Sequence, residues 1–86
     1  MAIHVYDTYA TASSGKILHF DVLMRVKDDD LAVKYAKAWL AEIGEADATV
    51  KSGNCAFCHT TADLPQYDQE LNQNGYAIYK LEGCPE

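Results

Sequence analysis

Apolar and polar side chains alternate along two stretches near the start of the chain, which is the pattern of strands with one buried face. The first stretch covers residues 2–10 and the second covers residues 17–26. The apolar face of the second stretch consists of Leu18, Phe20, Val22, Met24 and Val26. Gly15 lies between the stretches and favours a tight turn, so we expect a hairpin with a four-residue loop that places Ile3 opposite Met24.

A helical pattern follows the hairpin. Three aspartates at 28–30 suit a helix N-terminus, because a carboxylate there caps free backbone N–H groups and complements the helix dipole. Apolar residues then recur at the helical period: Ala32, Ala36, Trp39, Leu40 and Ile43. Gly44 is a natural residue for the position just after a helix. The pattern predicts a helix from the aspartates to Ile43, packed through Trp39.

The rest of the chain predicts three more elements. We expect a short strand over residues 46–51, a second helix from Leu64 to Asn74, and a last strand over residues 76–81. The order is then β-β-α-β-α-β in a single domain over residues 1–86, an α+β fold with a mixed four-stranded sheet packed against two helices. Right-handed crossovers would make the second, third and fourth strands parallel.

Composition narrows the classes of partner. Apolar residues make up 49% of the 86 residues and charged residues 23%, which is typical of a globular domain, and the net charge is −6. This acidic balance argues against nucleic acid and against anionic membranes as partners. Three cysteines favour a reducing cytoplasm over a disulfide framework. Nothing in the composition identifies a protein partner or an oligomeric state.

The motif with the clearest chemical potential is Cys55-Ala56-Phe57-Cys58-His59. Two thiolates at this spacing can bind one metal ion, for which zinc is the first choice, and Cys84 offers a third thiolate. In the expected parallel arrangement the three cysteines meet at one end of the sheet, with His59 or His4 as the fourth ligand. The motif also matches covalent haem attachment, but the N-terminus lacks the features of an export signal, so we expect no haem.

Other interpretations of these residues remain open. Cys55 and Cys58 could form a thiol redox pair if a helix N-terminus follows them, or they could be buried thiols that only fill the core. Exposed tyrosines on an open sheet face would instead suit a protein-interaction module. No nucleophile–base pair and no pair of carboxylates stands out, so we favour a non-enzymatic domain.

Two further polar features occur in the predicted hairpin. His19 and Asp21 are two residues apart on the mixed face of the second strand, which would suit an acid/base pair, although a solvated strand face explains them more simply. Asp7 falls on the same face as Ile3, and we interpret it as a cap of a nearby turn or helix end.

Several segments recur together in a known family. They are Ile3-His4-Val5-Tyr6-Asp7-Thr8-Tyr9, His19-Phe20-Asp21-Val22, Trp39-Leu40, Ala48-Thr49-Val50, Cys55-Ala56-Phe57-Cys58-His59, Asn74-Gly75-Tyr76-Ala77-Ile78-Tyr79-Lys80 and Glu82-Gly83-Cys84. On these residues the chain resembles, over nearly its whole length, the bacterial DUF2024 family, a domain of unknown function. The resemblance implies a small α+β protein and supplies neither an activity nor catalytic residues.

Overall fold

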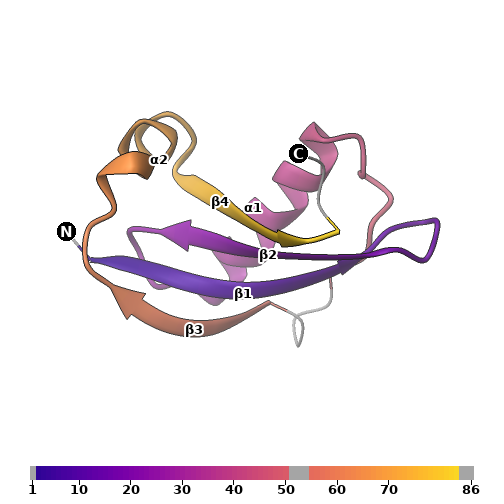
Figure 1. Cartoon of the computed structure of the whole chain (residues 1–86), viewed down its shortest axis with the longest axis horizontal. Coiled ribbons are helices and arrows are strands. Elements are labelled where there is room, and N and C mark those ends of the chain that lie inside the picture. The colour runs from indigo at the N-terminus through magenta and orange to yellow at the C-terminus, as the bar shows by residue number, and fades with distance from the viewer. Residues whose placement is uncertain (1, 51–54, 84–86) are drawn as a thin grey trace.

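The computed structural model describes residues 2–50 and 55–83 and contains strands and helices in the expected order, although the third strand lies further along the chain than expected. Strands β1 (Ile3–Thr11) and β2 (Ile17–Met24) form the hairpin, and α1 (Asp29–Glu42) follows them. Then come β3 (Cys55–Thr61), a single 3₁₀ turn (Pro65–Tyr67), α2 (Asp68–Asn74) and β4 (Tyr76–Glu82). The α+β class and the order β-β-α-β-α-β are therefore confirmed (Figure 1).

The prediction of a mixed sheet is wrong, because every neighbouring pair of strands is antiparallel in the order β3-β1-β2-β4. Strand β3 does run in the direction of β2, but β1 lies between them. The connection from β3 to β4 begins where Thr61 pairs with Ile3 and ends where Tyr76 pairs with Met24, at the same end of the sheet. The seven residues of α2 extend only about 10 Å, too little to return along a strand of about 23 Å.

The hairpin register differs by one residue from the expected one. His4 pairs with Met24 and Tyr6 with Val22, because the loop between the strands contains residues 12–16 instead of 12–15. The loop is closed by hydrogen bonds from the Gly15 N–H to the Ala12 carbonyl and from the Ala12 N–H to the Lys16 carbonyl. A shift of one residue exchanges the two faces of a strand. Ile3, Val5 and Asp7 therefore lie on the opposite face from Phe20.

Helix α1 covers one face of the sheet, as its apolar pattern predicts. The Asp28 side chain accepts a hydrogen bond from the Leu31 N–H at 3.0 Å and caps the helix. Ala32, Ala36, Trp39 and Leu40 are buried against the strands. The Trp39 ring packs on Phe20 with their centroids 4.6 Å apart. The main core lies in this layer and includes Tyr6, Ala10, Leu18, Phe20, Val22, Met24, Tyr76 and Ile78.

Helix α2 covers only part of the opposite face, at the end of the sheet where β4 begins (Figure 1). The second apolar cluster consists of Ile3, Val5, Leu23, Leu71 and Ala77, with Leu64 and Tyr67 packed against it. Beyond this cluster the face has no helix on it among the described residues. The partly covered face is called the open face below, and it carries Asp7 of β1 and His19 and Asp21 of β2.

The predicted strand over residues 46–51 is not a strand in its described part. Only a single bridge joins Thr49 to Thr11 there, while Val50 is buried in the core and residue 51 lies outside the described residues. The cysteine motif, which lies between the predicted third strand and the predicted second helix, forms β3 itself. His59 pairs with Val5 and Phe57 with Tyr6, so Cys58 is the extra residue of a β-bulge. Among the described residues, no helix has the length and apolar character needed to cross a membrane.

Candidate functional site

The predicted ligands of the cysteine site occupy different surroundings. Cys55 is 4% exposed, belongs to the main core, and accepts a hydrogen bond from the Thr8 hydroxyl at 3.3 Å. Burial raises the pKa of the Cys55 thiol. Cys58 is an exposed free thiol at the bulge, and Cys84 lies outside the described residues. The parallel strands from which we expected the three thiols to meet at one end of the sheet are not formed, because all neighbouring strands are antiparallel.

The two predicted histidine ligands are also separated from the buried thiol, since His59 lies on the other face and His4 lies four residues along β1 from Thr8, which pairs with Cys55. His59 pairs with Val5 and lies on the open face, whereas Cys55 pairs with Thr8 on the face that α1 covers. The His4 Nδ1 atom is 2.9 Å from the Thr60 hydroxyl oxygen, within hydrogen-bonding distance. Zinc binding by these residues remains a prediction.

A different cluster forms at the centre of the open face. Asp7, His19 and Asp21 each offer one ligand atom, and these atoms lie within 4.8 Å of one another. It is the one group of three or more such side chains found at that spacing in residues 2–50 and 55–83. The His19 Nε2 atom is 2.5 Å from the Asp7 Oδ1 atom, and all three residues are partly buried.

Local strand geometry explains why these three residues meet. Asp7 on β1 lies directly opposite Asp21 on β2, and His19 precedes Asp21 by two residues, so it points to the same face. Tyr9 pairs with His19 and stacks on its ring, with the centroids 4.2 Å apart and the planes 9° from parallel. The imidazole is therefore held between a tyrosine ring and a carboxylate.

The electrostatics of the cluster are dominated by two acids side by side. Burial, a hydrogen bond to Asp7 and repulsion by the Asp7 charge together raise the pKa of Asp21 from 3.8 to about 6. His19 and His59 act in the opposite direction. Among the described residues, neither Asp7 nor Asp21 forms an ion pair with a lysine or arginine. When both carboxylates are ionised they therefore repel each other, and the described groups that offset this charge are the imidazoles of His19 and His59.

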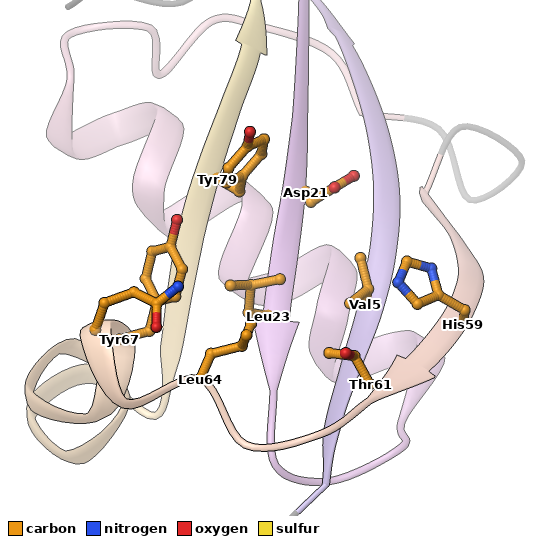
Figure 2. Close-up of a pocket in the computed structure, with 9 residues that line it drawn as sticks. Val5, Asp21, Leu23, His59, Thr61, Leu64, Tyr67 and Tyr79 are labelled. Carbon is orange, nitrogen blue, oxygen red and sulfur yellow. The ribbon is translucent and has the colours of Figure 1, made fainter.

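A shallow hollow of about 270 Å³ adjoins this cluster and shares Asp21 with it. Figure 2 shows Val5 and Leu23 in its middle, with Tyr67 on one side and His59 on the other. Its lining residues are Val5, Asp21, Leu23, His59, Thr61, Leu64, Gln66, Tyr67 and Tyr79. Tyr79 pairs with Asp21 across β2 and β4 and is 48% exposed. The hollow thus combines an apolar floor with a carboxylate at one end.

Replacing Asp7 by asparagine is expected to lower the pKa of Asp21 by roughly one unit, because the neighbouring charge disappears while burial remains. An NMR titration of the Asp21 side-chain carboxyl measures this directly. Asp47→Asn removes the same charge at an exposed position and should leave the Asp21 midpoint near that of the wild type. An unchanged midpoint in Asp7→Asn would contradict the pairing of the two carboxyls.

The same pKa has a consequence for stability. Since the pKa of Asp21 is higher in the folded chain than the ordinary value of 3.8, the folded state binds the proton more tightly. The contribution of this group to stability is complete below about pH 4 and is lost as the pH rises through about 6. Asp21→Asn should remove this part of the pH dependence, as measured by urea unfolding at pH 4.5 and pH 7.

Sequence reasoning found two members of the cluster and missed the third. His19 and Asp21 were recognised as a pair, but Asp7 was assigned to the other face because the hairpin register was one residue off. The position of Asp7 could have been predicted from the alternation of side chains along β1. Tyr6, Thr8 and Ala10 are buried under α1, so Asp7 must face the other way.

Comparison with known proteins identifies relatives but no activity. The family model described as "Domain of unknown function (DUF2024)" matches residues 1–81. The chain is 50% identical to protein NE1680 from Nitrosomonas europaea, whose NMR structure superposes with a TM-score of 0.87; the match covers 99% of this chain and 100% of that one. No curated protein is significantly similar to the chain. The match over residues 1–81 confirms the resemblance seen in the sequence, and the chain belongs to the DUF2024 family.

Proposed function

We propose that the protein is a small non-enzymatic binding domain that holds a divalent metal ion between Asp7, His19 and Asp21. The observation that carries this proposal is the convergence of three potential ligand atoms within 4.8 Å. All three side chains project from two paired strands. A site built on a sheet holds its ligands more rigidly than a site built on loops.

The chemistry of the donors supports an ion of the zinc type. One imidazole nitrogen and two carboxylate oxygens suit borderline divalent ions, whereas sites made of oxygen alone favour magnesium or calcium. A dication would also offset the repulsion between the two carboxylates, which the described lysines and arginines do not relieve. Three protein ligands leave at least one coordination position for another molecule, unlike a closed structural zinc site.

The cysteine motif provides the alternative location for a metal. Cys58 is exposed and His59 follows it directly, but Cys55 is buried and its hydrogen bond comes from Thr8. A thiolate at Cys55 would have to form in the apolar core, which burial disfavours. The Asp7–His19–Asp21 cluster is only partly buried, and the pKa of Asp21, at about 6, leaves its carboxyl largely ionised at neutral pH. We therefore prefer this cluster to the zinc and redox hypotheses for the cysteines.

Zinc affinity of matched variants tests the proposal. Zn²⁺ is titrated into tag-free, reduced protein by competition with a chromophoric chelator. We expect Asp7→Asn and His19→Ala to weaken binding at least about tenfold, since even residues that only support a ligand are worth 10–100-fold. Cys58→Ser and the exposed Asp47→Asn should bind zinc as the wild type does.

The opposite pattern would overturn the proposal. If Cys58→Ser loses zinc while Asp7→Asn retains it, the metal binds at the cysteine motif. If no variant differs from the wild type, binding is non-specific. Thermal unfolding of each variant without metal shows whether a lost affinity reflects a lost fold.

A further inference from the structure

We infer that the hollow beside the cluster binds a small carboxylate with a short hydrocarbon body, whose oxygen atoms complete the coordination of the metal ion. This inference rests on the proposed metal site and names the class of ligand that the site would take. It starts from one residue that both features share, since Asp21 belongs to the cluster and lines the hollow.

The shape of the hollow separates a polar end from an apolar one. Asp21 and Tyr79 lie at one end, while Leu64 and Thr61 lie at the other (Figure 2). Val5 and Leu23 form the floor and are 4% and 3% exposed, so they are fixed parts of the second apolar cluster. A molecule with its polar head at Asp21 would therefore rest its body on Val5 and Leu23.

The volume limits the size of the ligand. Pockets for drug-sized molecules usually enclose about 300–1,000 Å³, and this hollow, at about 270 Å³, lies below that range. It is also shallow, so only one side of a bound chain would be buried. These features suit a body of a few carbon atoms, which the rings of Tyr67 and Tyr79 could flank.

The charge of the cluster determines which head group the ligand can have, and it makes binding of that head group depend on the metal ion. Without a metal ion, Asp7 and Asp21 repel an anion. A bound dication cancels the charges of the two carboxylates and offers open coordination positions to an oxygen donor. A carboxylate should consequently bind the metal-loaded protein and not the metal-free protein, whereas a ligand held by the hollow alone would not distinguish the two forms.

The experiment uses zinc and hexanoate as probes and proceeds in two steps. The first step measures zinc binding alone, which tests the proposed function. The second step titrates hexanoate into zinc-loaded and metal-free protein and follows the backbone amide signals of Leu23 and Thr61 by NMR. We expect saturable shifts in the loaded protein and at least roughly tenfold weaker binding in the metal-free protein. Acetate, which lacks the hydrocarbon body, should bind the loaded protein more weakly than hexanoate.

A matched pair of variants on β4 locates the ligand. Tyr79→Ala alters the lining of the hollow, while Leu81→Ala removes a similarly exposed side chain that does not line it. Only Tyr79→Ala should weaken hexanoate binding, and both variants should bind zinc normally.

Three results would overturn the inference while the proposed metal site stands. They are zinc binding without hexanoate binding, equal hexanoate binding with and without zinc, and equal binding of acetate and hexanoate. Absence of zinc binding in the first step would overturn both the metal site and the inference built on it.

Discussion

Replacing Phe20 by alanine is expected to lower the free energy of unfolding by about 3–5 kcal/mol, the usual cost of removing a buried aromatic ring. Phe20 is 0% exposed and contacts Trp39, at the point where β2 meets α1. Its removal leaves a cavity between the sheet and the helix that rigid backbone on both sides cannot close. Urea unfolding followed by the fluorescence of Trp39 measures the loss.

The other phenylalanine of the chain is the matched control. Phe57 is 36% exposed, touches Tyr6 edge-on with the centroids 5.7 Å apart, and lies under the Lys27 ammonium. Its replacement by alanine leaves no enclosed cavity, so we expect a loss of only about 1 kcal/mol. Equal losses of unfolding free energy in the two variants would contradict the conclusion that the main core lies between the sheet and α1 and not at the edge strand β3.

The thiols of Cys55 and Cys58 should differ in reactivity by about a thousandfold or more. Cys58 is exposed, whereas a reagent reaches Cys55 only when the core opens. An opening that costs about 4 kcal/mol slows labelling by roughly a thousandfold. Alkylation with iodoacetamide, resolved by mass spectrometry of peptides, follows each thiol separately in the folded protein.

Unfolding supplies the control for this measurement. In concentrated urea both thiols should react at the same rate, because the protection of Cys55 comes from the fold. Fast labelling of both in the folded protein would contradict the burial of Cys55. Reversible oxidation to a Cys55–Cys58 disulfide under mild oxidant would instead support the thiol redox hypothesis.

The elements of this fold follow from local patterns in the sequence. Alternation marks β1 and β2, the Asp28 cap and the stripe through Trp39 mark α1, and Gly75, with φ of 84°, ends α2 in the left-handed conformation that glycine favours. Each of these signals involves residues close together in the chain. They predict β1, β2, α1 and β4 and the class of the fold, but not the position of β3, which was expected over residues 46–51 and lies at Cys55–Thr61.

Strand pairing depends on contacts between segments that are far apart in the chain, and local sequence patterns do not predict these contacts. The position of β1 between β2 and β3, and the short α2 that reverses the chain, place the strands in an antiparallel order. The rule that favours parallel crossovers applies to strands joined by a helix long enough to span the sheet. We expected Cys55, Cys58 and Cys84 to gather because of that rule, so the antiparallel order removes the reason for the expectation, while the gathering itself remains a prediction.

Whether the candidate site forms depends on the pairing of β1 with β2, and a shift of one residue in that pairing would remove it. With a four-residue loop, Asp7 would lie under α1, and His19 and Asp21 would form an ordinary solvated face. The five-residue loop instead places Asp7 opposite Asp21 and beside His19. Loop length is weakly specified by sequence, since Gly15 can serve either loop. The cluster on the open face can therefore be recognised only when the pairing of the strands is known.

The central claim is that metal binds to oxygen and nitrogen atoms of the open face, and the local structure around a bound ion tests it most directly. X-ray absorption at the zinc edge, on wild-type protein loaded with one equivalent of zinc, measures the bond lengths. We predict oxygen and nitrogen neighbours at about 2.0–2.2 Å and no sulfur. Sulfur neighbours at about 2.3 Å would place the ion at the cysteine motif and contradict the account.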